Sequence, residues 1–249
     1  MMKHKFKVAT LLAALFMSAN VAQASLISVG TGLVYDNVAN VTWSSDANLF
    51  ATMAAANPNL VNQIIAAVPT VHDTPNTSDS PVANSGNYTL STGDFNSAGV
   101  MTWWGAMAWA KYLGSINYLG HNTWEQPTTY DQTCANYNCT NSMLGELFYT
   151  AMGGTAGSSI PASSLFTNVQ SSSYWSGTEY TADTYPLAAW RLQTYNGFQS
   201  QTYKNGNLYS WVVLPGNAAA SAVPEPAGLA LFGIGLLGLM VGRRHRRFG

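Results

Sequence analysis

Three segments of the chain decide its fold: Ser173-Tyr-Trp-Ser-Gly-Thr-Glu-Tyr180, Ala189-Trp-Arg-Leu-Gln-Thr-Tyr195 and Leu208-Tyr-Ser-Trp-Val-Val-Leu214. Apolar and polar residues alternate along them, and a period of two is typical of strands with one buried face. Asn-Gly pairs stand at positions 196–197 and 205–206. This dipeptide is the strongest short-range signal for a hairpin. The sequence therefore predicts an antiparallel meander.

Two main helices are predicted before the meander. The first spans Thr102 to Leu113, with Thr102 as its N-cap and one apolar face formed by Trp103, Ala106, Met107, Ala110 and Leu113. The second spans Asn141 to Met152 and presents Leu144, Leu147, Phe148 and Ala151 together. Helices followed by antiparallel strands predict an α+β domain.

Shorter elements are predicted nearer the N-terminus. Leu33 to Tyr35 and Val41 to Trp43 flank the turn-forming pair Asp36-Asn37, which indicates a hairpin. Asn48 to Ala56 favours a short helix, and Asn57-Pro58 begins another whose buried face holds Val61, Ile64, Ile65 and Val68. Residues 70–96 are rich in Pro, Ser, Asn, Thr and Asp, and predict a long polar loop.

The first 24 residues have the composition of a secretory signal peptide. Lys3, Lys5 and Lys7 precede an apolar run at residues 8–19, and Ala22-Gln23-Ala24 matches an A-x-A cleavage site. We therefore expect the secretion machinery to export the chain and signal peptidase to cut after Ala24. An uncleaved anchor is the weaker alternative, because the apolar run is too short to span a bilayer.

The last 27 residues contain three parts in a fixed order. Pro224-Glu225-Pro226 comes first, an uncharged Leu/Gly-rich run fills residues 227–242, and a basic cluster follows at Arg243, Arg244, Arg246 and Arg247. A full membrane span needs about 20 residues, so the run is a marginal transmembrane segment. Arginines stay on the cytoplasmic side, which predicts that everything before Pro224 lies outside.

These three parts resemble the PEP-CTERM sorting signal of Gram-negative bacteria. The resemblance implies recognition by exosortase, a membrane-embedded cysteine protease, and cleavage near the Pro-Glu-Pro tripeptide. It further implies a transient stay in the inner membrane, transfer to the cell surface or extracellular matrix, and a host that makes exopolysaccharide and biofilm. An ordinary tail anchor is the alternative, but an anchor has no need of Pro-Glu-Pro at its outer edge.

The charge of the exported part differs from that of the whole chain, whose formal net charge is −1. Seven of the ten Lys and Arg residues lie in the two terminal signals, which leaves Lys111, Arg191 and Lys204 against eleven acids. The part up to Pro226 therefore carries −8. An acidic surface repels polyanions, so nucleic acids and sulfated glycans are excluded as expected partners. An isolated Lys204 or Lys111 could still hold a single anion.

A second resemblance extends over nearly the whole exported part. Its motifs are Gly32-Leu-Val-Tyr-Asp36 with Val41-Thr-Trp43, Met101-Thr-Trp103, Trp124 with Pro127-Thr128, Tyr174-Trp-Ser-Gly-Thr178 and Trp211-Val-Val-Leu-Pro-Gly216. In this order they resemble the Lcl C-terminal domain family, which is similar to the sulfatase-modifying (formylglycine-generating) and C-type-lectin-like folds. The family usually has Arg where this chain has Glu125. That family is associated with sulfated glycosaminoglycans, whereas the charge here predicts no binding to heparin.

The resulting domain organisation has four parts. Residues 1–24 form the signal peptide, 25–217 a single exported Lcl C-terminal-like domain, 218–222 a linker and 223–249 the sorting signal. Within the sorting signal, residues 227–242 are the predicted transmembrane segment and 243–249 the basic cytoplasmic end.

Chemical motifs are scarce in the exported part. Cys134 and Cys139 are the only cysteines and predict a disulfide in an exported chain, with a thiol pair for copper or redox chemistry as the alternative. His72 and His121 show no metal-ligand spacing, although a calcium site assembled from distant loops stays open. We predict no catalytic residues, no metal and no cofactor.

Aromatic residues are the remaining candidates for binding. Flat rings suit the apolar faces of sugars, so we name Trp124, Trp175, Tyr195 and Tyr209 as candidate glycan contacts. A core role is the favoured interpretation for most aromatic residues of the strands, and the tips near Asn196 and Asn205 are the better sites for exposed contact. Three hypotheses follow: a non-catalytic surface protein that binds exopolysaccharide, an enzyme derived from the formylglycine-generating fold, and a purely structural matrix protein.

Overall fold

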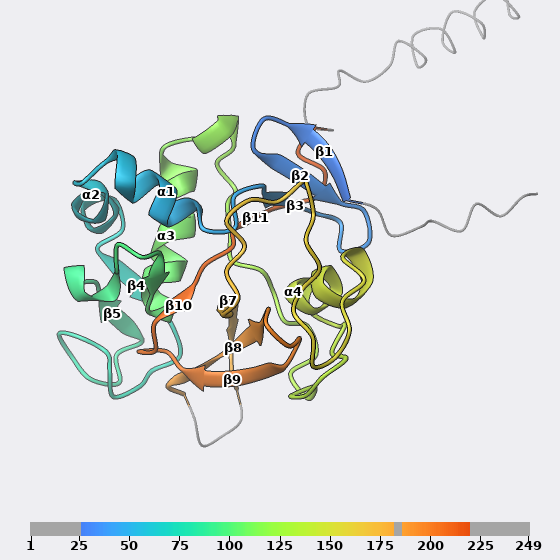
Figure 1. The fold of residues 1–249 in the computed structure, drawn as a ribbon. Coiled ribbons are helices and arrows are strands. Elements are labelled where there is room, and N and C mark those ends of the chain that lie inside the picture. Colours follow the sequence, from blue (N-terminus) through green and yellow to red (C-terminus); the bar gives the residue numbers. More distant parts are fainter. Residues whose placement is uncertain (1–25, 182–185, 220–249) are drawn as a thin grey trace, which may run out of the picture.

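A computed structural model describes residues 26–181 and 186–219 as a mixed helix and sheet structure (Figure 1). The predicted signal peptide and sorting signal lie outside these residues. Three sheets are formed. The four-stranded sheet has the order β1 (Leu26–Gly30), β2 (Leu33–Asp36), β3 (Val41–Ser44), β11 (Val213–Pro215), and the five-stranded sheet has the order β6 (Val100–Met101), β10 (Leu208–Tyr209), β7 (Ser173–Glu179), β8 (Ala188–Gln193), β9 (Gln199–Tyr203). The third pairs β4 (Thr70–His72) with β5 (Asn87–Thr89).

The four-stranded sheet confirms the predicted N-terminal hairpin. β2 and β3 are antiparallel, with Val34 opposite Trp43 and Asp36 opposite Val41. One strand from the far end of the domain completes the sheet, because β11 pairs with β3 and sets Val213 opposite Trp43. The first and last strands of the domain thus belong to one sheet.

The helices follow the predicted pattern closely. α3 (Trp103–Ser115) begins as predicted after Thr102, whose hydroxyl accepts a hydrogen bond from the Gly105 backbone N–H at 3.2 Å. α1 (Leu49–Ala56) is confirmed, whereas α2 (Leu60–Ala67) begins later than predicted because Asn57 forms a turn with Asn59. α2 buries Leu60 and Ile64. The second main helix starts after Ser142 as α4 (Met143–Glu146) and continues as the π-helical turn η3 (Leu147–Ala151).

The meander is confirmed only in part. β7, β8 and β9 are consecutive antiparallel neighbours, and the turn containing Asn196-Gly197 joins the last two, with Gly197 at a φ of +79°. The hairpin predicted at Asn205-Gly206 is wrong. β10 does not pair with β9 but lies parallel to β7, on the edge of β7 that faces away from β8. The third predicted strand is also divided between two sheets. Trp211 explains the division, since its buried ring packs against Trp43 at 5.4 Å.

The predicted loop at residues 70–96 is more ordered than its composition indicates. It contains β4, β5 and the short 3₁₀ turn η1 (Thr92–Asp94). Between the strands, buried polar side chains take the place of an apolar core. Asp79 Oδ2 accepts hydrogen bonds from the backbone N–H groups of Asn76 at 3.0 Å and Gly86 at 2.6 Å. Satisfied polar groups can be buried without a large penalty, which explains how so polar a segment folds.

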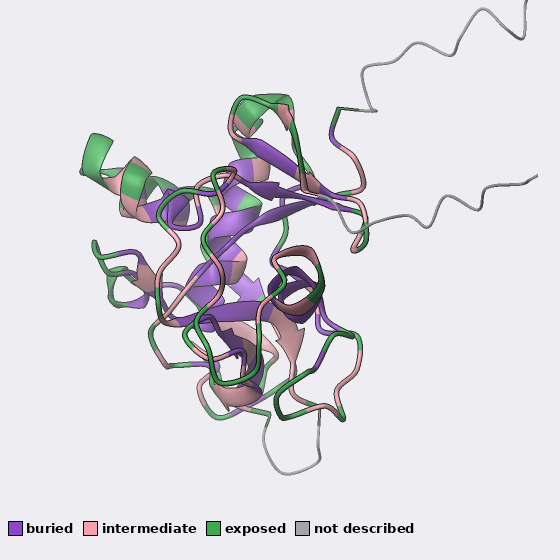
Figure 2. Ribbon diagram, turned by 45° about the vertical axis from the view of Figure 1, so that its right-hand side comes forward, coloured by how far each residue is buried: buried purple, intermediate pink, exposed green. Residues whose placement is uncertain are grey.

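Buried residues gather along α3 and the strands beside it (Figure 2). One apolar cluster joins α1, α2 and α3 to β7, and includes Phe50, Trp103, Trp109 and Trp175. A second lies between the four-stranded sheet, α4 and the start of β7, and includes Trp43, Phe148, Tyr174 and Trp211. The eight tryptophans of the chain are therefore mainly core residues.

Candidate functional site

Several predicted functional residues lie outside the described part of the chain. These are Ala22 and Ala24 of the cleavage site, the Pro224-Glu225-Pro226 tripeptide, and Arg243, Arg244, Arg246 and Arg247. The transmembrane segment at 227–242 also falls there. Within residues 26–181 and 186–219, no helix has the length and apolar character that crossing a bilayer requires.

The two cysteines form the predicted disulfide. Cys134 is bonded to Cys139 across a loop of five positions. The Gln199 side-chain amide donates to the carbonyl oxygen of Cys134 at 2.9 Å, which ties this loop to the start of β9. Both sulfurs are engaged, so this pair does not present free thiols for copper or redox chemistry.

Two of the candidate glycan contacts are core residues. Trp124 is 5% exposed and its indole N–H donates to the Tyr118 carbonyl at 3.1 Å. Trp175 is fully buried and donates to the Met101 carbonyl at 2.9 Å. A sugar cannot stack on a ring that other side chains already cover, which corrects the prediction for these two tryptophans. Tyr209 is half-buried and packs beside Tyr174 at 5.6 Å.

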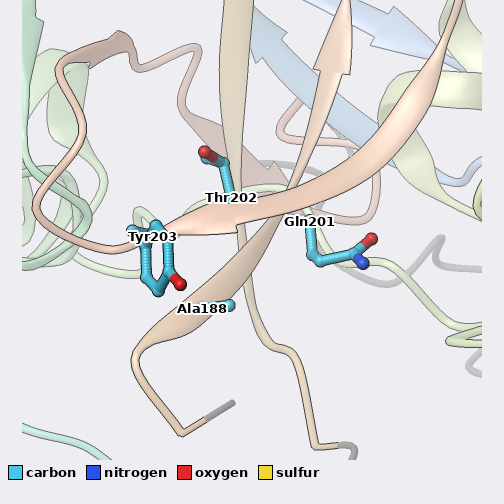
Figure 3. Close-up of a pocket in the computed structure, with 4 residues that line it drawn as sticks. All are labelled: Ala188, Gln201, Thr202 and Tyr203. Carbon is cyan, nitrogen blue, oxygen red and sulfur yellow. The ribbon is translucent and has the colours of Figure 1, made fainter.

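Exposed tyrosines lie at both ends of the β8–β9 hairpin. Tyr195, at the turn after β8, is 42% exposed, and Tyr203, at the end of β9, is 57% exposed. Tyr203 lines a shallow depression of about 230 Å³ together with Ala188, Gln201 and Thr202 (Figure 3). Figure 3 shows Tyr203 and Gln201 on one side of β9 and Thr202 on the other, as strand alternation requires. This surface is the candidate binding site.

The amide group of Gln201 adds polarity to this depression. Its Oε1 atom is buried and has no hydrogen-bond donor among the described residues. The exposed ring of Tyr203 can contact the apolar face of a sugar, whereas the buried Gln201 oxygen is out of reach of a sugar hydroxyl in this conformation. The depression is open and small compared with enclosed sites for small molecules, which typically exceed about 300 Å³.

Arg191 of β8 makes polar contacts without a carboxylate partner in the described chain. Its Nη1 donates to Ser173 Oγ at 2.7 Å. In the orientation of the Gln193 amide that satisfies both groups, the Gln193 oxygen accepts from Arg191 Nη1 at 2.8 Å and Nη2 at 3.0 Å. Burial lowers the pKa of the Arg191 guanidinium from its usual range. These contacts use much of the hydrogen-bonding capacity of this cation.

A buried ionic cluster forms where three strands end. Lys204 follows β9, Asp73 follows β4 and Glu179 ends β7. The Lys204 Nζ atom lies 2.6 Å from Asp73 Oδ2 and 2.9 Å from Glu179 Oε2. The side chains of Lys204 and Asp73 are both 0% exposed. Sequence reasoning treated Lys204 as an isolated cation able to hold an anion, which is wrong because these carboxylates occupy it.

A second buried pair joins Asp36 at the end of β2 to Glu146 at the end of α4. Asp36 Oδ1 accepts from the backbone N–H groups of Val38 at 3.0 Å and Ala39 at 3.2 Å. Within the described chain, the only donor that can reach Asp36 Oδ2 or a Glu146 oxygen is a proton carried by one of these two carboxyl groups. Burial, a hydrogen bond to Asp36 and the Asp36 charge together raise the pKa of Glu146 far above its usual range. The two carboxyl groups therefore share a proton.

The shared proton predicts a pH-dependent stability. A raised folded-state pKa means that the stabilisation is complete below the ordinary Glu pKa of 4.5 and is lost as pH rises toward the folded-state value. The free energy of unfolding should fall by up to about 1.4 kcal/mol per pH unit above pH 4.5 through this group. Glu146→Gln should flatten that slope and stabilise the protein at pH 8, as measured by urea unfolding across pH. An unchanged slope would contradict the shared proton.

The histidines do not assemble a metal site in the described chain. His72 is exposed on β4, and His121 is half-buried after the 3₁₀ turn η2 (Tyr118–Gly120). No group of three or more His, Cys, Asp or Glu side chains within residues 26–181 and 186–219 could hold a metal ion. Glu125, which stands where the resembled family usually has Arg, is exposed on a bridge to Val213.

Sequence reasoning missed both buried clusters. One signal was available for Lys204, because it is one of only three cations in the exported part and stands next to strand residues. Asp73 and Glu179 are 106 positions apart and give no local pattern. Asp36 lies in a segment that favours a turn, and its Oδ1 atom accepts the backbone hydrogen bonds of that turn. The sequence gives no sign that the other oxygen, Oδ2, is buried without such a bond.

Comparison with known families identifies the tail. The PEP-CTERM protein-sorting motif matches residues 222–247, which include the Pro-Glu-Pro tripeptide and the four arginines. No curated protein and no solved structure matches the chain. The motif indicates a protein that is exported, sorted at the membrane and targeted to exosortase.

Proposed function

We propose that this chain is a non-catalytic protein of the cell surface or extracellular matrix that binds neutral polysaccharide of the exopolysaccharide layer. The sorting motif at residues 222–247 supports the destination, because exosortase substrates pass through the inner membrane to the cell exterior. In this proposal, signal peptidase removes residues 1–24 and exosortase cuts near Pro224-Glu225-Pro226. The processed domain then remains in contact with the polysaccharide.

The observation that carries the binding proposal is the exposed ring of Tyr203 at the depression on β9 (Figure 3). Aromatic side chains of this domain are otherwise used mainly in its core. A tyrosine that keeps 57% of its surface exposed at this depression is therefore a candidate contact for the face of a sugar ring. Tyr195 at the other end of the hairpin extends the same kind of surface.

Charge supports a neutral ligand. Lys204 is enclosed by two carboxylates, so among the cations of the described chain only Lys111 and Arg191 lie outside an ion pair. A run of sulfates needs several cations together. The acidic exported part has no such group at the β9 depression, whose lining residues are uncharged.

The resemblance to the Lcl C-terminal domain supports a ligand-binding role over a catalytic one. An enzyme derived from the formylglycine-generating fold would need reactive thiols, whereas Cys134 and Cys139 are bonded to each other. The buried carboxyl pair of Asp36 and Glu146 lies beneath side chains of the core and is not at the β9 depression.

Tyr203→Ala should weaken binding to neutral polysaccharide by about tenfold, which corresponds to roughly 1.4 kcal/mol for the loss of one stacked ring. The measurement is affinity electrophoresis of the exported domain in gels containing neutral polysaccharides chosen from a glycan array. Binding should be insensitive to salt, and a heparin column should not retain the protein at physiological salt.

Tyr130→Ala is the matched control, since Tyr130 is also 57% exposed but is not among the residues that line the β9 depression. It should leave affinity unchanged. Equal affinity of the Tyr203→Ala variant and the parent protein would remove the β9 depression from the proposal. Absence of any glycan binding by the parent would favour the purely structural matrix protein, and retention on heparin that weakens steeply with salt would contradict the charge argument.

A further inference from the structure

The buried cluster of Lys204, Asp73 and Glu179 has the composition and geometry of a site for covalent cross-linking. We propose that the Lys204 amine and the Asp73 carboxyl group condense to an intramolecular amide bond, with Glu179 as the group that transfers the proton. This inference is independent of any glycan ligand.

The reacting groups are already in contact. Lys204 Nζ lies 2.6 Å from Asp73 Oδ2, and neither side chain is exposed. Hydrogen bonds fix both backbone polar groups of Lys204. Its N–H donates to the Leu187 carbonyl at 2.6 Å, and its carbonyl accepts from the Trp103 N–H at 2.8 Å. Prior positioning of this kind removes much of the entropic cost of a reaction between two groups.

Aromatic rings cover the reacting amine. Lys204 Nζ lies 4.8 Å from the ring centroid of Trp103 and 5.9 Å from that of Trp104. Tyr88 stacks on Trp104 at 3.9 Å and closes that side of the cluster. Attraction between these rings and a cation stabilises the ammonium form, so a proton must leave Nζ before it can attack. Transfer of a proton from the ammonium to a carboxylate removes two charges and produces the neutral amine that is the nucleophile.

Two hydrogen-bond donors to one oxygen of Asp73 make its carboxyl carbon easier to attack. Oδ2 accepts hydrogen bonds from the Trp104 indole N–H at 2.8 Å and the Asn76 amide at 3.0 Å. These donors can stabilise the negative charge that develops on Oδ2 when Nζ attacks the carboxyl carbon. Oδ1 has no donor in the described chain. It is therefore the oxygen that can take up protons and leave.

The reaction balances without an added reagent. The Nζ–Cγ bond forms, the Cγ–Oδ1 bond breaks, and one water molecule leaves. Glu179 accepts a proton from the attacking nitrogen and returns it to Oδ1. The Glu179 carboxylate is held by the backbone N–H of Thr74 at 3.0 and 3.1 Å, and its side chain is 21% exposed. That partial exposure provides an exit for the released water.

Trypsin mapping of the exported full chain tests the proposal directly. The exported part has three trypsin sites, after Lys111, Arg191 and Lys204. With the disulfide reduced and alkylated, the peptide containing Asp73 and ending at Lys111 should remain joined to the peptide that begins at Leu192. The joined species should have the summed mass less one water, with no cleavage after Lys204. Cleavage after Lys111 is the internal control.

Separate peptides with complete cleavage after Lys204 would overturn the proposal, as would a bond from Lys204 to Glu179. Because this measurement uses the parent protein, it does not depend on whether a variant folds. Lys204→Arg keeps a cation at the site but supplies no amine nucleophile, so the joined species should be absent. Glu179→Gln should slow formation of the bond by about a hundredfold, the usual lower range for loss of a proton-transfer group. A joined species in the Arg variant would also contradict the proposal.

Discussion

We expect Lys204→Met to lower the free energy of unfolding by about 3–5 kcal/mol, because the substitution removes the cation from a buried ion pair and leaves the carboxylates without a partner. Asp73 would keep a carboxylate with 0% exposure and no cation beside it. Methionine retains most of the aliphatic length of lysine, so the loss reports charge more than volume. Urea unfolding of the exported protein, with the disulfide intact, measures the effect.

Lys111→Met is the control for this substitution. Lys111 is exposed on α3, and replacement of an exposed residue usually changes stability by less than about 0.5 kcal/mol. Adding Asp73→Asn and Glu179→Gln to Lys204→Met should restore part of the loss, because it also removes the unpaired charges. A Lys204→Met variant within about 1 kcal/mol of the parent would contradict the structural importance of the cluster. In a parent that carries the proposed amide, a covalent cross-link replaces the Lys204–Asp73 ion pair, so the variant would lose that cross-link and the difference in stability would be larger.

Pro224→Ala combined with Glu225→Ala should block processing of the tail and leave the full-length chain in the membrane of its native host. The two substitutions remove the parts of the tripeptide that distinguish the matched motif from a plain apolar anchor. Proline also restricts the backbone before the apolar run, which a protease that recognises an extended segment can exploit. Fractionation of cells followed by intact-mass measurement of the released protein reports the result.

Asn217→Ala with Ser221→Ala is the matched control, since both positions precede the motif at residues 222–247. This control should be processed normally. Release of a shortened chain by the Pro224 and Glu225 variant at the parent's rate would show that the tripeptide does not direct sorting in this protein.

Local patterns predicted the elements whose stability is itself local. Thr102 caps α3 as expected, because an N-cap needs only a hydroxyl and an N–H three positions later. The β2–β3 hairpin follows from two apolar stretches and a turn. The Asn205-Gly206 signal failed because burial of Trp211 against the other sheet outweighs a turn preference worth far less energy.

The candidate sites were less predictable because their partners are distant in sequence. Lys204 and Asp73 are 131 positions apart, and nothing near either residue indicates the other. Tyr203 was not among the residues named from the sequence, and the hairpin predicted beside it does not form, whereas the burial of Trp124 and Trp175 depends on which elements pack over them. A tryptophan in a strand pattern fits both environments, so only the assembled fold separates core rings from contact rings.

The shared sheet of β1 and β11 determines how the domain would be presented. The described chain enters at Leu26 and leaves at residue 219, both beside the four-stranded sheet, while the β8–β9 hairpin lies toward the opposite end of the molecule (Figure 1). A protein held through its C-terminal tail would therefore have the four-stranded sheet nearest the point of attachment and the β8–β9 hairpin farther from it. Because β11 is the last described strand before the tail, tension on the tail would first load the pairing of β11 with β3.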